Sequence, residues 1–235
     1  MSITDVDALL EAISQVNLDF IPLPLAIALH VVAFMVLMLL FFLPNRYARE
    51  VNALVKAWLA ISLGMVTAFI LGVARAFSGM DVAILSFGAV VYAGVAVLVL
   101  ADIWRRNLDF TSERTGLRQW MGLAVALCGI LLYSLTQLSM GLRYPRMVFY
   151  GAEVPTAIYL IALFGAARPI KSKLFRVILA ILSVEATLIG IWAVAAQVWF
   201  DAYMGLAGLF GLASLASWIA AERKQAKASA AHMSQ

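Results

Sequence analysis

Ionisable side chains inside apolar stretches are the residues of this chain best suited to chemistry. Glu185 lies midway along one apolar stretch, Glu153 lies near the start of the preceding one, and His30 lies within the first. A charge inside a lipid bilayer is costly, so such residues often mark proton or ion pathways. These three residues are therefore the leading candidates for an ion or solute site.

Glu185 has two interpretations. It is either a proton or cation site, or a protonated carboxyl group that hydrogen-bonds a neighbouring helix. Small and hydroxyl residues form a stripe on the opposite side of the same helix: Ala180, Ser183, Thr187 and Gly190. Because such a stripe permits close helix packing, both sides of this helix should face protein or water. We expect it to be a central helix or part of an oligomer contact.

Glu153 also has two interpretations, and one of them depends on Pro155. A proline frees a backbone carbonyl, here near Gly151, and a bend or break at that point would let Glu153 line an outward-facing cavity. Alternatively, Glu153 forms an ion pair with an arginine near the outer boundary: Arg75, Arg143 or Arg146.

His30 either hydrogen-bonds across helices as a neutral imidazole or belongs to a proton relay with Glu153 or Glu185. Four further polar side chains could join either network: Tyr133, Gln137, Thr156 and Tyr159.

Several classes of site are absent from the sequence. One histidine within the apolar stretches excludes a bis-histidine haem pair. Cys128 is the only cysteine, which excludes an intrachain disulfide and a cysteine-based metal site. No ligand spacing suits zinc, no glycine-rich phosphate loop is present, and the last apolar stretch lacks the lysine of a retinal protein. The sequence predicts no cofactor and no metal, and an enzyme is not expected.

The composition is that of a membrane protein. Of the 235 residues, 64% are hydrophobic and 13% are charged, with a mean hydropathy of +0.97. A soluble domain carries about 25% charged residues, so this chain cannot cover a globule with polar surface. The net charge of +4 comes without the basic tracts that nucleic-acid binding needs. The predicted partner is the lipid bilayer, and no nucleic acid is expected.

The apolar stretches have the length of membrane spans. A helix needs about 20 apolar residues to cross a bilayer, and backbone groups inside lipid must be paired within the chain. The sequence therefore predicts an all-α integral membrane bundle of about seven transmembrane helices, forming one domain over residues 21–221. The predicted spans lie near 22–43, 54–74, 82–103, 119–140, 148–167, 175–197 and 200–220.

The distribution of Lys and Arg predicts the orientation. Alternate segments between the spans carry 14 of the 17 Lys and Arg residues, and the other segments carry 3. Positive residues collect on the cytoplasmic side, so the N-terminus is predicted outside and the C-terminus in the cytoplasm. On the cytoplasmic side, Asp102 lies near Arg105 and Arg106 in the sequence and is predicted to join an interfacial charge cluster.

Both ends of the chain differ from the spans. Within residues 1–20, Leu9, Leu10 and Ile13 share one helical face and the acidic residues lie mostly on the other. This pattern predicts an amphipathic helix on the outer surface. The segment lacks the basic start and the cleavage site of a signal peptide. Residues 222–235 are small and polar, and are predicted to form a cytoplasmic tail.

Similar segments in the two halves of the chain suggest a parallel repeat of three spans, one linking span and three spans. Residues 24–29 resemble 155–160, and residues 54–61 resemble 174–181. Two glycine pairs share one spacing: Gly88 with Gly94, and Gly205 with Gly211. Apolar helices also match by chance, so the repeat is a hypothesis. It favours a carrier with a site between the halves near the membrane midplane.

The start of the fifth predicted span carries a resemblance to a known family. Tyr144-Pro145 is followed by Phe-Tyr-Gly-Ala-Glu-Val-Pro-Thr over residues 149–156. On these residues, spans 2 to 7 resemble a family of bacterial multi-spanning membrane proteins known only as a domain of unknown function, in which a glycine precedes a Pro-Cys-Pro-Thr turn at this place. This chain keeps the glycine and the final Pro-Thr but lacks the first proline and the cysteine. Glu153 falls within this departure, and the resemblance implies no activity.

Two functions fit these features. The first is a carrier or channel for a small solute or ion, with a buried acidic site at Glu185 and Glu153. The second is a non-catalytic accessory or assembly subunit of a larger membrane complex, since the loops are short and no soluble domain is present. A homo-oligomer would favour the first function, and a complex with unrelated subunits would favour the second. The alanine-rich composition and the lack of a targeting peptide favour a bacterial inner membrane.

Overall fold

The computed structural model describes residues 6–43, 45–111, 116–167 and 172–233, and these are helical over most of their length. Within them, six helical stretches are long and apolar enough to cross a membrane. They are α2 (Leu23–Phe42), α3 (Ala48–Ala74), α4 (Met80–Arg105), the continuous run of α5 (Leu117–Leu127), η2 (Cys128–Leu132) and α6 (Tyr133–Ser139), α8 (Lys173–Ala195), and η3 (Trp199–Asp201) continuing into α9 (Ala202–Met233). The protein is thus a multi-pass, all-α integral membrane protein, as the composition predicts.

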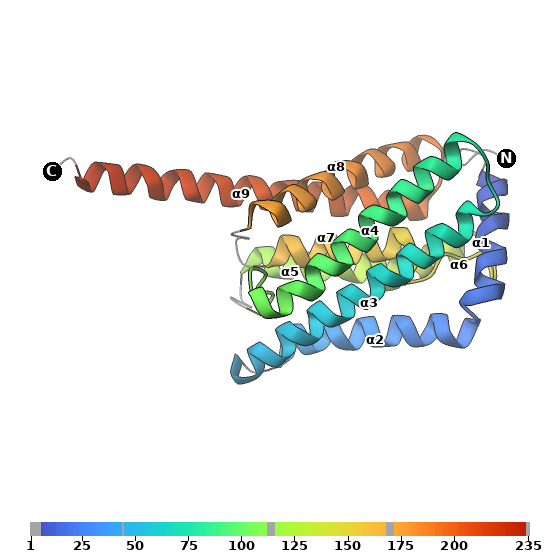
Figure 1. Ribbon diagram of the computed structural model, residues 1–235, viewed down its shortest axis with the longest axis horizontal. Helices are drawn as coiled ribbons and strands as arrows, with labels where there is room; N and C mark the ends of the chain where they lie inside the picture. The colour runs from blue at the N-terminus through green and yellow to red at the C-terminus, as the bar shows by residue number, and fades with distance from the viewer. Residues whose placement is uncertain (1–5, 44, 112–115, 168–171, 234–235) are drawn as a thin grey trace.

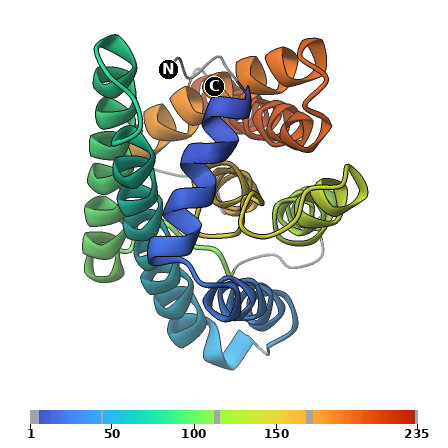
Figure 2. The ribbon, with the colours of Figure 1, turned by 90° about the vertical axis from the view of Figure 1, so that its right-hand side faces the viewer.

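The long helices run side by side around one shorter helix, α7 (Glu153–Ala166) (Figures 1 and 2). All residues from Pro155 to Ala166 are buried, because α7 is enclosed by its neighbours on every side. The helix carrying Glu185 was expected to be central or part of an oligomer contact, and the first alternative is wrong for the single chain. That helix is α8, which packs at the side of the bundle against α9 (Figure 2).

The fifth predicted span, near 148–167, is not one continuous helix. The 14 residues of α7 extend about 21 Å, less than the thickness of about 30 Å that a span must cross. The chain reaches α7 through a non-helical segment, residues 140–152, whose last part from Met147 to Ala152 is largely buried. Non-helical backbone at membrane depth is tolerated only where protein or water surrounds it. We call residues 144–152 the entry segment.

The start of α7 is set by two residues. Pro155 lies in the first turn, where a helix has no need of its missing N–H. Gly151 has φ +102°, a conformation that side chains with a Cβ rarely adopt. The break that the sequence predicts near Gly151 is therefore present, and it takes the form of a helix that begins late.

Helix α1 (Val6–Phe20) lies across one end of the bundle, nearly perpendicular to the long helices (Figures 1 and 2). Its apolar face is buried at Ala12, Ile13 and Val16, while Glu11 is exposed. Part of the predicted N-terminal segment, residues 1–5, lies outside the described residues. At the opposite end of the bundle, α9 continues as a helix well beyond the other elements (Figure 1).

Asp102 was predicted to join an interfacial charge cluster near Arg105 and Arg106, but among the described residues its ion-pair partner is Lys56 instead. It is 1% exposed and forms an ion pair with Lys56 of α3, with 2.8 Å between Nζ and Oδ2. Its carboxylate also accepts hydrogen bonds from the backbone N–H groups of Asn107 and Leu108, each at 2.9 Å. The charge therefore connects two helices and fixes the segment that follows α4.

The small-residue stripe of α8 packs tightly against α9. A Cβ added to Gly190 would collide with the backbone of Gly205, and one added to Gly211 would collide with Ser183. In contrast, a Cβ added to Gly88 or Gly94 of α4 would meet nothing within 4 Å. The two glycine pairs that suggested a repeat thus have different surroundings.

Candidate functional site

Three polar side chains meet at a cavity beneath α1. Glu153 comes from the first turn of α7, Tyr133 from α6 and Asp201 from η3. The cavity has a volume of about 120 Å³, and its other lining residues are mostly apolar. Tyr133 is fully buried and donates a hydrogen bond from its hydroxyl to Asp201 Oδ1 at 2.7 Å.

A second cavity, of about 160 Å³, extends from Glu153 to Glu185. It lies along one side of α4 and shares Ile70, Leu85 and Glu153 with the first cavity. Glu153 therefore stands between the two spaces. Carboxyl groups from α7, α8 and η3 thus line these two adjacent cavities.

The structure brings together three of the residues that the sequence predicts, namely Glu153, Glu185 and Tyr133. Asp201 is a lining residue that the sequence analysis does not single out. It lies at the start of the predicted last span, near 200–220. The available signal was an acidic residue in the first turn of an apolar stretch long enough to cross a membrane.

Within the residues that the structure describes, Glu153 does not form the ion pair with an arginine that was its alternative interpretation. Among the described residues, Arg146 instead pairs with Glu11 at 3.4 Å, and the Arg75 guanidinium lies over the Phe20 ring. Arg143 donates its hydrogen bonds to backbone carbonyls. Glu153 thus lines the cavities without an arginine partner in the described part of the chain.

Glu185 lies on the side of α8 that faces away from α9. It is exposed in the single chain, and its neighbours along this face, Ile181 and Trp192, are exposed as well. The second cavity thus reaches the side of the bundle between α4 and α8. A carboxyl group placed there adjoins whatever covers this face in the membrane, either lipid or protein.

His30 lies apart from the acidic cavities. Its Nδ1 lies 2.9 Å from the Ala26 carbonyl, and its Nε2 lies 3.1 Å from the Ser134 hydroxyl. The backbone N–H of Tyr150 also donates to Nε2, at 3.4 Å. These partners suit a neutral imidazole protonated on Nδ1. The geometry matches the interpretation of His30 as a hydrogen-bonding group between helices.

The remaining candidates hold the entry segment and α7 in place. Gln137 donates to the carbonyl of Val148 at 2.8 Å and accepts from its N–H at 2.7 Å. Thr156 accepts from the N–H of Gly151 at 2.9 Å. The Tyr159 hydroxyl donates to the carbonyl of Ala33 on α2, at 3.2 Å.

Asn17 of α1 has a similar part at the start of the entry segment. Its side-chain amide donates to the carbonyls of Pro145 and Met147, both at 2.7 Å. Backbone groups outside a helix need partners when they are buried, and these side chains provide them. Several polar residues that look like a transport network in the sequence therefore have a structural use here.

Replacing Gln137 by leucine tests this structural use. The change leaves the N–H and carbonyl of Val148 without their partners, so we expect the free energy of unfolding to fall by about 2 kcal/mol. The measurement is unfolding in mixed micelles of a mild detergent and dodecyl sulfate. Gln15→Leu, on the exposed side of α1, serves as the control and should have little effect. Equal stability of both variants would contradict the assignment.

Comparisons with known proteins do not extend this description. No family model matches the chain, no curated protein is similar to it, and no solved structure resembles it. The resemblance to the bacterial family of unknown function thus rests on the sequence pattern alone.

Proposed function

We propose that the protein is a carrier or channel for a small solute or ion, with an acidic site formed by Glu153, Glu185, Asp201 and Tyr133. The observation that supports this is that three carboxyl groups line two adjacent cavities of a membrane bundle. Carboxyl groups in such an environment are costly and are kept where they bind protons, cations or polar solutes. Four further side chains support the site through hydrogen bonds to neighbouring helices or to the entry segment: His30, Gln137, Thr156 and Tyr159.

The two helix pairs around the site suggest how access would change. The α3–α4 pair and the α8–α9 pair each pack closely within themselves, and the second cavity lies where the pairs face each other. Movement of one pair against the other would open or close this region, as in carriers whose halves rock around a central site. In a channel, α1 could act as the gate, because it covers the first cavity and its movement would open that cavity to the outside.

Flux measurements on purified protein in liposomes test this function. We expect the wild type to pass protons or sodium ions, measured with a trapped pH indicator and with radioactive sodium. Glu153→Gln and Glu185→Gln remove the charges and should abolish most of the flux while leaving the protein folded. Glu50→Gln, which changes an exposed acid at the start of α3, should leave flux unchanged.

Two results would count against the proposal. Flux that is unchanged in both glutamine variants would remove the acidic site from the mechanism. Absence of flux from the wild type, for protons and sodium alike, would argue against an ion pathway and favour the second candidate function.

The second candidate is an accessory or assembly subunit of a larger membrane complex, and exposed Glu185 favours it. This carboxyl group lies on an apolar face with Ile181 and Trp192, where a helix of another subunit would provide a better environment than lipid. Native mass spectrometry of gently released protein distinguishes the two functions. Unrelated subunits in fixed ratio would support the accessory function, whereas a monomer or homo-oligomer would support the carrier.

We place the protein in a bacterial inner membrane with its N-terminus outside and its C-terminus in the cytoplasm. The charge distribution supports this orientation, and the opposite positions of α1 and the end of α9 agree with it (Figure 1). The parallel repeat remains a hypothesis, since its glycine pairs pack differently.

A further inference from the structure

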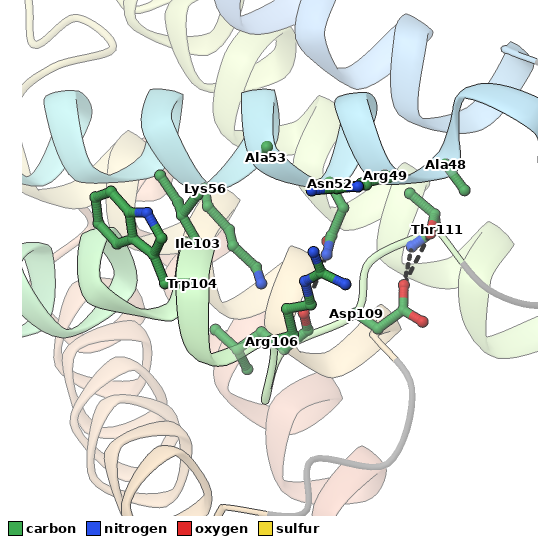
Figure 3. Close-up of a pocket in the computed structure, with 11 residues that line it drawn as sticks. Ala48, Arg49, Asn52, Ala53, Lys56, Ile103, Trp104, Arg106, Asp109 and Thr111 are labelled. Carbon is green, nitrogen blue, oxygen red and sulfur yellow. Dashed lines mark hydrogen bonds between the residues drawn. The ribbon is translucent and has the colours of Figure 1, made fainter.

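A basic cleft lies at the end of the bundle opposite α1. It is formed by the first turns of α3, the end of α4 and the segment after it, and its volume is about 490 Å³ (Figure 3). Six polar or charged residues line it: Arg49, Asn52, Lys56, Arg106, Asp109 and Thr111. The cleft lies far from the acidic cavities and shares no lining residue with them.

Two of the cations in this cleft have no acidic partner in the described part of the chain. Lys56 is neutralised by Asp102, and Asp109 accepts hydrogen bonds from the N–H and hydroxyl of Thr111. Among the described residues, neither Arg49 nor Arg106 forms an ion pair, and both side chains are exposed. The cleft therefore presents two guanidinium groups that can bind an anion.

The position of Arg106 is held by the fold. Arg106 ends α4 in the left-handed conformation, with φ 54°, where glycine or asparagine is the usual residue. Asp102 fixes the backbone on both sides, because its carbonyl accepts from Arg106 N–H at 2.9 Å and its carboxylate binds the next residues. In Figure 3 the Arg106 side chain extends from this turn toward Asn52 on α3. The left-handed backbone conformation is costly for an arginine, and here it directs the Arg106 side chain into the cleft.

The surroundings of the cleft are those of a membrane interface. Trp104 is 74% exposed and lines the cleft next to Ile103, in the last turn of an apolar helix. Tryptophan is enriched where the lipid headgroups begin. The cleft thus combines cations at the end of two spans with an apolar wall that continues along the membrane.

We propose that this cleft binds the phosphate group of an anionic phospholipid, with Arg49 and Arg106 as its ligands and Trp104 and Ile103 beside the acyl chains. Guanidinium groups bind phosphate oxygens in pairs, and basic pockets at the ends of transmembrane helices suit lipid headgroups. The cleft shares no residue with the acidic cavities, so the lipid-binding proposal does not depend on whether the protein transports a solute.

Native mass spectrometry with defined lipids tests the site. The purified protein is titrated with phosphatidylglycerol or with zwitterionic phosphatidylcholine, and the affinity for the first bound lipid is measured. We expect the wild type to prefer phosphatidylglycerol. Arg106→Gly should weaken its binding by about tenfold, since it removes charge-assisted hydrogen bonds. Glycine is favoured at φ 54°, so this variant should unfold at no lower a temperature than the wild type.

Two further variants sharpen the result. Arg49→Gln should weaken binding by a similar factor, whereas Arg105→Gln changes a neighbouring exposed arginine that does not line the cleft and should bind normally. Binding by Arg106→Gly as tight as that of the wild type would overturn the proposal, and so would equal affinity of the wild type for both lipids. Displacement of the lipid by millimolar inorganic phosphate would also overturn it, because the ligand would then be a soluble phosphate.

Discussion

Replacing Lys56 by methionine is expected to lower the free energy of unfolding by about 3–5 kcal/mol, because it leaves the carboxylate of Asp102 buried without its counter-charge. Both side chains are 1% exposed, and Lys56 Nζ also donates to the backbone carbonyl of Asp102 at 3.0 Å. Desolvation of the remaining charge cannot be compensated by water, so the loss should far exceed that of an exposed ion pair.

A double variant separates the cost of the buried charge from the value of the pair. Lys56→Met combined with Asp102→Asn should recover part of the lost stability, because no uncompensated charge remains. Lys173→Met, at the exposed start of α8, is the matched control and should change stability little. The measurement is unfolding in mixed micelles. If the single and double variants were equally stable, the ion pair would not be buried as described.

Replacing Gly208 by alanine should lower the free energy of unfolding by about 3 kcal/mol, because it forces α8 and α9 apart. An added Cβ would approach the Ser183 carbonyl oxygen to 2.5 Å and the Thr187 nitrogen to 2.6 Å. Both are backbone atoms, so no rotation of a side chain can relieve the contact. Close approach at glycine is a common basis for helix association in membranes.

Gly88→Ala is the matched control for this prediction. It introduces the same methyl group into α4, where nothing lies within 4 Å, so stability should be unchanged or rise by up to about 1 kcal/mol. Thermal unfolding in detergent, followed by circular dichroism, compares the two variants. Equal melting temperatures would show that α8 and α9 do not depend on this contact. A strong loss in Gly88→Ala would instead indicate that an oligomer contact covers α4.

The sequence by itself determined the class of the protein and the extent of most of its helices. Apolar runs of about 20 residues require a paired backbone in lipid, so their helical state follows from composition alone. The expected span near 175–197 corresponds to α8, for example, and the stripe from Ser183 to Gly190 was correctly identified as a packing surface. Periodicity is a local property, and the sequence carries it directly.

The tertiary structure decided how the polar residues are used. Glu153 and Glu185 line the second cavity, whereas His30, Gln137 and Thr156 hydrogen-bond to a neighbouring helix or to the entry segment. The residue type does not distinguish solute binding from structural hydrogen bonding, since a polar side chain that can bind a solute can equally hydrogen-bond a buried backbone group. The sequence could not show which backbone is left unpaired until the break before α7 was located.

Tertiary structure also decided which charged residues that are distant in the sequence form ion pairs. Asp102 looks like a member of a basic cluster with Arg105 and Arg106 because these residues are adjacent in the chain. Its real partner, Lys56, lies 46 positions away and meets it because α3 and α4 pack against each other. The same packing leaves Arg106 without an acidic partner among the described residues and opens the cleft beside it. Electrostatic pairing depends on distance in space, and spacing along the chain does not set that distance.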